Sequence, residues 1–328
     1  MTTIAITGVG GFIGLRMVER ARELGWEVRG VDVDPAGAKL AEEAGASTVV
    51  GDINDGELLE ELFEGADVVF HTAAIVDETG DRDLFYRVNV EGTRSVCAAA
   101  KAVGVKRLVH LSSVMVYGFD YPEGIDETFE VEEYFNIYCE TKKVSEDEAF
   151  RFHEPGALEV IVIRPGDVYG ARSRPWMLRP LETMEAGLFN LPGGGRGIVN
   201  HVHVDNLLDA VFLALEKDAT GEAFNVTDGV ATACIEFFRF HAEMLGKKSV
   251  PCLPTGLLKG MLTVAGPVYR LRGKEPPATK EALNFLLRHS KISSEKARRE
   301  LGFEPRIDLK TGMAQVAEEL RLAGRLDV

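Results

Sequence analysis

Short apolar segments alternate with amphipathic segments through the first half of the chain. The apolar segments have the length of strands, and the segments between them repeat apolar residues at the spacing of a helix. Because parallel strands can be joined only by a crossover, this alternation predicts an α/β fold, a doubly wound parallel sheet with helices on both faces. The predicted strands are residues 4–7, 27–32, 47–51, 67–73, 107–112 and 158–164, and the predicted helices are residues 13–24, 36–44, 57–63, 83–103 and 137–152.

The pattern becomes less regular after Pro165, where a glycine-rich loop follows at residues 193–197. Near the end of the chain, Ser293 and Ser294 are expected to cap a final short helix that ends at Gly302. The pattern in the second half of the chain therefore predicts a smaller and less regular C-terminal part after the main sheet. Its other expected features are helices at residues 205–215 and 232–245 and breaks at the prolines in positions 251, 254, 276 and 277.

Charge and composition exclude several classes of protein. The 328 residues include 52 acidic and 37 basic side chains, which gives a formal net charge of −15. Nucleic acid is not an expected partner, because a polyanion needs a basic footprint. The sequence has neither an apolar window of about 18 residues nor a cationic and apolar leader, so we expect no stable membrane insertion and a cytoplasmic location. The cysteines, at positions 97, 139, 234 and 252, lack paired spacing and are expected to be free thiols.

A glycine-rich turn lies between the first predicted strand and the first predicted helix. Residues 7–14 read Thr-Gly-Val-Gly-Gly-Phe-Ile-Gly, a G-x-x-G-x-x-G pattern. Gly8 allows a tight turn, Gly11 lets the backbone approach a pyrophosphate, and Gly14 lets the helix pack closely on the strand. The phosphates of a dinucleotide are then expected at the helix N-terminus, where free N–H groups and the helix dipole favour negative charge.

An acidic residue follows this turn at the distance that a dinucleotide site requires. Asp32 ends the second predicted strand, 24 residues after Gly8. A carboxylate at this position accepts hydrogen bonds from the adenosine ribose hydroxyls and repels a 2′-phosphate. The sequence therefore predicts NAD rather than NADP as the cofactor.

Three further side chains have the chemistry of proton transfer. Tyr138 and Lys142 are four residues apart on a predicted helix, so they share one face. We expect the lysine cation to stabilise the phenolate and to lower the pKa of Tyr138 toward neutral pH. Such a tyrosine can exchange a proton with an alcohol or a carbonyl while hydride moves to or from nicotinamide. Ser113, at the end of the fifth predicted strand, is placed to hydrogen-bond the same substrate oxygen.

With these motifs the chain resembles the extended short-chain dehydrogenase/reductases over nearly its whole length. In that family the tyrosine is the catalytic acid/base, the lysine binds the nicotinamide ribose, and the serine orients the reacting oxygen. These roles fall on Tyr138, Lys142 and Ser113. The motifs that carry the resemblance are residues 7–14, Gly51-Asp52-Ile53, His71-Thr72-Ala73-Ala74, residues 89–93, Ser112-Ser113, residues 116–118, residues 138–142, Arg164-Pro165, residues 168–170 and residues 203–206.

The resemblance also implies a cofactor site, an assembly and a domain division. By motif match Asp52 contacts adenine, and a homodimer is implied in which the helices at residues 83–103 and 137–152 pack against a partner. A Rossmann-type NAD-binding domain is implied for residues 1–170, with residues 198–226 returning to it, and a substrate-binding part for residues 171–328. The expected cofactor-binding residues are Gly8, Gly11, Phe12, Ile13, Gly14, Asp32, Asp52, Ile53, Ala73, Ala74, Tyr138, Lys142 and Pro165.

One departure from the family pattern bears on the substrate. Nucleotide-sugar epimerases and dehydratases carry an arginine that binds the substrate diphosphate in a segment matching residues 198–205, and Val199 stands at that position here. A valine cannot neutralise a diphosphate. A UDP-sugar 4-epimerase remains an alternative, because another arginine, at position 172, 174, 179 or 196, can replace the missing one.

A second feature resembles another branch of the family. Residues 71–77 and Val199-Asn200 are similar to the matching stretches of 3β-hydroxysteroid dehydrogenases, and the tail is laid out like that of sterol-4-carboxylate 3-dehydrogenases. The apolar segment at residues 251–272 either lines a hydrophobic substrate or covers the core. We therefore expect an NAD-dependent oxidoreductase for a secondary alcohol or ketone on a hydrophobic small molecule, with a non-catalytic NAD-binding scaffold as a further alternative. The expected substrate-binding residues are Val76, Val114, Met115 and Val168, and no metal site is expected.

Overall fold

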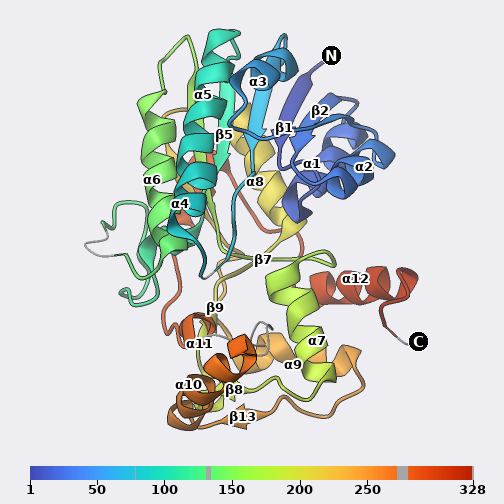
Figure 1. Cartoon of the computed structure of the whole chain (residues 1–328), viewed down its shortest axis with the longest axis vertical. Helices are drawn as coiled ribbons and strands as arrows, with labels where there is room; N and C mark the ends of the chain where they lie inside the picture. Colours follow the sequence, from blue (N-terminus) through green and yellow to red (C-terminus); the bar gives the residue numbers. More distant parts are fainter. Residues whose placement is uncertain (78, 131–133, 272–279, 327–328) are drawn as a thin grey trace.

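A seven-stranded parallel sheet forms the centre of the computed structural model, which describes residues 1–77, 79–130, 134–271 and 280–326 (Figure 1). The strand order is β11-β6-β5-β4-β1-β2-β3, so the direction of winding reverses between β1 and β4. The predicted doubly wound α/β fold is confirmed. The strands are β1 (Thr3–Thr7), β2 (Glu27–Asp32), β3 (Ser47–Val50), β4 (Val68–His71), β5 (Arg107–Leu111), β6 (Glu159–Pro165) and β11 (Ala223–Val226).

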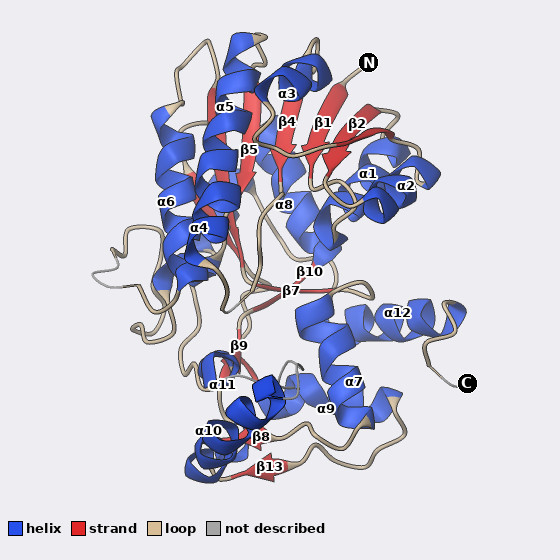
Figure 2. Cartoon of the chain, viewed as in Figure 1, coloured by secondary structure: helices blue, strands red, loops and turns tan. Residues whose placement is uncertain are grey.

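Helices cover both faces of this sheet (Figure 2). Side chains alternate along each strand, so Ile4 and Ile6 of β1 face one helical layer and Ala5 faces the other. The first layer contains α1 (Phe12–Glu23), α2 (Pro35–Glu43) and α8 (Val204–Glu216). The second layer contains α3 (Gly56–Phe63), α5 (Gly92–Ala102) and α6 (Ile137–Arg151). The strands are therefore buried on both sides, which explains their continuous apolar runs.

A smaller part packs below the carboxyl ends of the strands in the view of Figure 1. It has a separate apolar cluster that includes Met177, Phe237 and Met313. Before this part is complete, residues 204–226 return to the sheet as α8 and β11. Its elements are α7 (Arg179–Glu185), α9 (Cys234–Met244), α10 (Thr255–Leu271), α11 (Lys280–Phe285), α12 (Leu309–Leu322) and the short paired strands β7 (Asp167–Tyr169) with β10 (His201–His203), β8 (Leu191–Pro192) with β13 (Cys252–Leu253) and β9 (Ile198–Val199) with β12 (Thr232–Ala233).

Two predicted helices differ from the structure. The helix expected at residues 83–103 is divided into α4 (Arg82–Phe85), a π-helical turn at Tyr86–Glu91 and α5. Such turns often occur at functional sites, and this one holds Asn89, whose side chain bonds both backbone groups of Ile75 in the segment after β4. The segment expected as the final helix does end at Gly302, with φ of +72°, but α12 follows it.

The two serines near the end of the chain also have different roles. The hydroxyl of Ser293 accepts the N–H of Glu295 at 3.3 Å, as a cap does, whereas the hydroxyl of Ser294 bonds Thr227. The prolines at positions 276 and 277 lie outside the described residues. Within the described part of the chain, no helix has both the length and the apolar character that a membrane span needs.

Candidate active site

The glycine-rich turn joins β1 to α1 at the point where the sheet reverses its winding. Gly8 has φ of +68°, and a Cβ there would lie 2.9 Å from the backbone N of Ala73. A Cβ at Gly14 would lie 2.2 Å from the carbonyl oxygen of Gly8. Both positions therefore require glycine, one for its conformation and both for the close approach of backbone. Open α/β sheets bind ligands at this reversal point, outside the carboxyl ends of the strands.

The N-terminus of α1 has the donors that a pyrophosphate needs. Its N-cap residue is Gly11, which has no side chain to accept the N–H groups of the first turn. A helix with unsatisfied N–H groups at this end attracts an anion through both hydrogen bonds and the helix dipole. The turn therefore fits the diphosphate of a dinucleotide.

The carboxylate of Asp32 stabilises the turn that surrounds it. Its Oδ2 accepts the N–H of Gly10 at 2.9 Å, and its Oδ1 accepts the N–H of Asp34 at 3.0 Å. Each carboxylate oxygen has a second lone pair, so the side chain can still accept two ribose hydroxyls. Asp32 is thus both a support of the loop and a candidate ribose acceptor.

Asp52, the expected adenine contact, accepts more hydrogen bonds within the protein than Asp32 does. Asp52 accepts the backbone and side-chain N–H groups of Asn54, each at 3.0 Å, and forms an ion pair with Arg87 at 2.6 Å. The hydrogen bond from the Asn54 backbone, with smaller effects of the Asn54 side chain and Arg87, holds the pKa of Asp52 below its usual value. Asp52 is therefore an ionised acceptor that must share its lone pairs with any adenine amino group.

The remaining expected cofactor residues fall into two groups. Ala73 lies directly against Gly8, and Phe12 packs against Gly170, so both border the turn. By contrast, Ile53 is 7% exposed and packs against Gly92, which makes it a core residue in this structure. Ile13 packs against the main apolar cluster, and Pro165 is buried at the end of β6. Ala74 is half-buried.

Tyr138 and Ser113 meet at the carboxyl end of β5. Tyr138 comes from the first turn of α6, and the Ser113 hydroxyl lies close enough to its phenol to lower the pKa of that phenol. The hydroxyl oxygen of Ser113 also accepts the N–H of Met115 at 3.1 Å, which orients it. Both residues are buried, with 9% and 7% of their surface exposed. The structure therefore brings together two hydroxyls that the sequence places 25 residues apart.

The expected lowering of the tyrosine pKa is wrong for this structure. Burial raises the pKa of Tyr138 to about 12, and the neighbouring Ser113 hydroxyl offsets only part of that effect. Lys142 is buried in the next turn of α6, where its Nζ donates to the carbonyl oxygen of Leu111 at 2.7 Å. Burial lowers the pKa of Lys142 to about 8, although the nearby Glu146 carboxylate opposes the shift. Desolvation thus has the largest effect on both groups.

Two buried imidazoles lie beside Lys142. His71 bonds Thr7 through Nδ1 at 2.7 Å and Thr93 through Nε2 at 2.9 Å. The ring of His110 lies 5.2 Å from that of His71. Burial, and to a smaller extent the Lys142 charge, lowers the pKa of His71 to about 3 and that of His110 well below its usual value. Both rings are therefore neutral at pH 7, and His71 serves as a structural hydrogen-bonding group.

His71 gives a pH-dependent stability with a defined sign. The unfolded imidazole binds a proton below about pH 6.5, whereas the folded one remains neutral until about pH 3. Stability is therefore lost as the pH falls through this window, with a slope of about 1.4 kcal/mol per pH unit from this group. We expect His71→Gln to reduce the slope of unfolding free energy against pH by that amount between pH 6 and pH 4, measured by urea denaturation. An unchanged slope would contradict the assignment.

Of the four expected substrate residues, one lies close to Tyr138. Met115 belongs to the same buried cluster as Tyr138. Val114 points into a different cluster, Val168 packs against the main core, and Val76 is 65% exposed. The cluster around Tyr138 instead contains three phenylalanines that the sequence analysis did not single out, namely Phe85, Phe119 and Phe285.

Val199 lies in β9 and is fully buried in the apolar cluster of the smaller part. It therefore contacts protein rather than a diphosphate. The arginines considered as replacements are dispersed: Arg172 pairs with Glu19 at 2.8 Å and Arg174 with Glu182 at 3.8 Å. Arg196 is exposed, and Arg179 is half-buried at the start of α7.

Comparison with known proteins agrees with this geometry. A family model described as the NAD dependent epimerase/dehydratase family matches residues 4–227. The chain is similar to a 3-beta-hydroxysteroid dehydrogenase of Mycolicibacterium neoaurum, with 32% identity over 95% of this chain and 89% of that protein. It is also similar to the 4-hydroxy-2-methyl-3-oxo-4-farnesyl-3,4-dihydroquinoline-1-oxide ketoreductase of Stigmatella aurantiaca, with 28% identity over 97% and 96% of the two chains. Among solved structures, MoeE5 in complex with UDP-glucuronic acid and NAD is 25% identical, with a TM-score of 0.77 over 98% of this chain and 99% of that chain.

Proposed function

The chain belongs to the NAD dependent epimerase/dehydratase family, and from that membership we propose that it interconverts a secondary alcohol and a ketone on a hydrophobic small molecule. Tyr138 gives or takes the proton of the substrate oxygen, Ser113 hydrogen-bonds that oxygen, and Lys142 binds the nicotinamide ribose. The observation that carries the proposal is that the buried side chains of Tyr138 and Ser113 lie beside each other at the carboxyl end of β5, where Ser113 acts on the pKa of the phenol. A pure NAD-binding scaffold has no need for this pair.

The N–H groups at the start of α1 hold the diphosphate of NAD, and Asp32 holds the adenosine ribose. NAD supplies the hydride acceptor or donor. The buried position of Tyr138 excludes water from the proton that it exchanges, and Ser113 fixes the position of the substrate oxygen relative to the phenol. Residues 1–170 with 198–226 form the cofactor half in this proposal, and the rest of residues 171–328 forms the substrate half.

Three observations favour a hydrophobic substrate. Val199 is buried where nucleotide-sugar enzymes carry their diphosphate-binding arginine. Two of the three similar proteins named above act on a steroid and on a farnesylated quinoline, both of them largely apolar molecules. Residues around Tyr138 agree with such a substrate, because Met115, Phe119 and Phe285 surround it with apolar atoms.

A UDP-sugar epimerase is the second candidate, and the similarity to MoeE5 with its bound UDP-glucuronic acid favours it. The two candidates differ in what stabilises the folded protein. A ligand that binds only the native state raises the thermal midpoint. We expect NAD with a 3β-hydroxysteroid to raise the midpoint above that with NAD alone, and UDP-glucose to leave it unchanged. A shift with UDP-glucose and none with the steroid would replace our proposal with the epimerase.

The choice of NAD over NADP is tested at Asp32. We expect Asp32→Asn to weaken NAD binding by about 10–100-fold, because a charge-assisted hydrogen bond to ribose contributes about 1.5–3 kcal/mol. Loss of the negative charge should also narrow the preference for NAD over NADP. Both dissociation constants can be measured by calorimetry. Asp34→Asn is the matched control, because Asp34 caps α2 through Ala36 and asparagine caps equally well; equal effects of the two variants would contradict the assignment of Asp32.

A further inference from the structure

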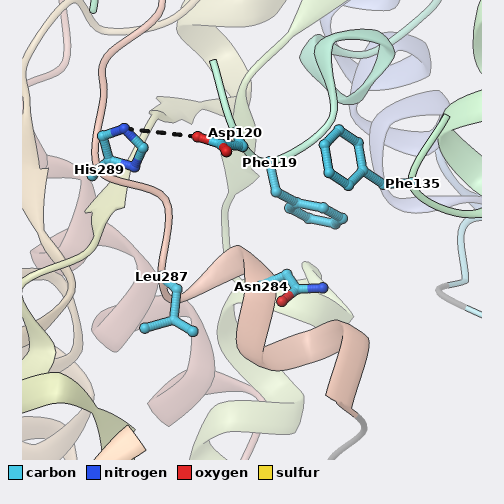
Figure 3. Close-up of a pocket in the computed structure, with 6 residues that line it drawn as sticks. All are labelled: Phe119, Asp120, Phe135, Asn284, Leu287 and His289. Atoms are coloured by element: carbon cyan, nitrogen blue, oxygen red, sulfur yellow. Dashed lines mark ion pairs between the residues drawn. The ribbon is translucent and has the colours of Figure 1, made fainter. Parts of the chain in front are cut away.

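A cavity of about 220 Å³ opens where the two parts of the chain meet, close to the start of α6 (Figure 3). Residues 119 and 120 follow β5, Phe135 precedes α6, and the remaining lining residues lie in or just after α11. The cavity is therefore lined by three segments that are distant in sequence: one after β5, one before α6, and α11 with the residues that follow it. The lining residues are Phe119, Asp120, Phe135, Asn284, Leu287 and His289.

Phe119 connects this cavity with the catalytic groups. It lines the cavity and also belongs to the buried cluster that contains Met115 and Tyr138. Its ring packs edge-to-face on Phe285, with centroids 4.8 Å apart, and on Phe135, with centroids 5.8 Å apart. Phe119 is 8% exposed, whereas Phe135 is 51% exposed. The rings thus form a continuous aromatic path from the surface to the neighbourhood of Tyr138.

The chemistry of the lining favours an uncharged, apolar occupant. Three of the six lining residues, Phe119, Phe135 and Leu287, are apolar, and the amide of Asn284 can hydrogen-bond a neutral polar group. At the rim, the carboxylate of Asp120 faces His289 at 4.0 Å, as Figure 3 shows. Among the described residues, neither a lysine nor an arginine lines this cavity, and the Asp120 carboxylate repels phosphate.

We propose that this cavity binds the distal part of the substrate, an extended apolar molecule with a neutral polar group at its far end, and that Phe119 and Phe135 determine specificity for it. This inference rests on the proposed function, because it places the reacting alcohol or ketone at Tyr138. The volume fits part of a ligand rather than all of it, since complete small-molecule sites measure about 300–1,000 Å³. The reacting end occupies the Tyr138 cluster, and the other end passes Phe119 to reach Asn284.

The test compares a long and a short substrate in a variant of the cavity wall. Phe135→Asp places a charge against the apolar occupant, and an acidic residue just before a helix N-terminus is compatible with the start of α6. Leu188→Asp is the matched control, because Leu188 is 52% exposed and lies outside the cavity. The substrates are dehydroepiandrosterone, a 3β-hydroxysteroid with a neutral ketone at its far end, and cyclohexanol, which fills only the reacting end. KM is measured with NAD for both alcohols, and steroid binding to the enzyme with NAD is measured by calorimetry.

We expect Phe135→Asp to raise the KM and the Kd for the steroid roughly tenfold or more, and to leave the KM for cyclohexanol and the Kd for NAD unchanged. Leu188→Asp should change none of these. If the wild type oxidises the steroid and Phe135→Asp does so with unchanged KM and Kd, the cavity assignment is overturned and the proposed function stands. If the wild type binds the steroid, loses it in Phe135→Asp and never oxidises it, the cavity assignment stands and the proposed function fails. A wild type that neither binds nor oxidises the steroid overturns both.

Discussion

Replacement of Tyr138 by phenylalanine should lower kcat by about 10²–10⁴-fold, which is the usual contribution of a positioned acid or base. The ring and its packing with Met115 and Phe119 are retained, so the loss is confined to the hydroxyl. The fold and the NAD site should persist, because the turn at Gly8 and the carboxylate of Asp32 are formed by other elements. Steady-state kinetics with an alcohol substrate and NAD calorimetry check the two expectations together.

A lower kcat with unchanged NAD binding would show that the Tyr138 hydroxyl takes part in the reaction and is not needed for the fold or the cofactor site. Ser113→Ala is the companion variant, and it should also lower kcat, because the substrate oxygen loses a donor and Met115 loses its hydroxyl acceptor. Cys139→Ser is a neighbouring control in α6, because the Cys139 thiol is buried and burial raises its pKa to about 12, so it stays protonated. Full activity in Tyr138→Phe would remove the phenol from the mechanism.

The pKa values of Tyr138 and Lys142 indicate which of the two side chains keeps its proton as the pH rises above neutral. With its pKa raised to about 12 by burial, Tyr138 is protonated at neutral pH and is able to act as an acid toward a ketone oxygen. Lys142, whose pKa burial lowers to about 8, loses its charge above that pH. We therefore expect ketone reduction to decline as the pH rises through about 8, and a pH profile of kcat measured for reduction checks this. A profile that is flat to pH 10 would contradict a role for the lysine charge.

The strands were predictable because they are buried on both faces and have short apolar runs. Residues 27–32 were predicted with the bounds of β2, and the helices around the sheet, apart from residues 83–103, differed by at most one residue at each end. Helix 83–103 was not predicted as divided, because the π-helical turn depends on Asn89 bonding the backbone of Ile75, a contact between separate elements. The smaller part was harder still: α7 and α12 complete a cluster with Phe237 that has no local signature in the sequence.

The candidate site shows the same limit at the level of single residues. Motif spacing was sufficient to single out Gly8, Asp32, Ser113, Tyr138 and Lys142, because each sits at a strand end or on one helix face. Spacing could not show that Lys142 donates to the carbonyl of Leu111, or that desolvation would raise the pKa of the phenol. The aromatic rings of Phe119 and Phe285 are 166 residues apart in sequence, so only the folded chain brings them together.

A buried ion pair holds α6 on the sheet. Glu146 lies one turn after Lys142 in α6, and Arg164 lies near the end of β6. The Arg164 guanidinium binds both carboxylate oxygens of Glu146, through Nε at 2.9 Å and through Nη2, and donates to the hydroxyl of Tyr117 at 2.7 Å. Tyr117 in turn donates to Asn225 of β11 at 2.9 Å. The side chains of the pair are only 8% and 1% exposed, so water cannot replace either partner.

Removal of the arginine should therefore be among the most destabilising single changes in the chain. We expect Arg164→Met to lower the free energy of unfolding by about 3–5 kcal/mol, because it leaves the Glu146 carboxylate buried without its partner. The double variant Arg164→Met/Glu146→Leu should recover much of that loss, since it removes the unpaired charge as well. Lys101→Met is the surface control: its pair with Glu154 is 44% and 57% exposed, so its loss should cost no more than about 1 kcal/mol. Urea denaturation of the four proteins measures these differences, and an Arg164→Met effect as small as that of Lys101→Met would show that the pair does not hold α6 in place.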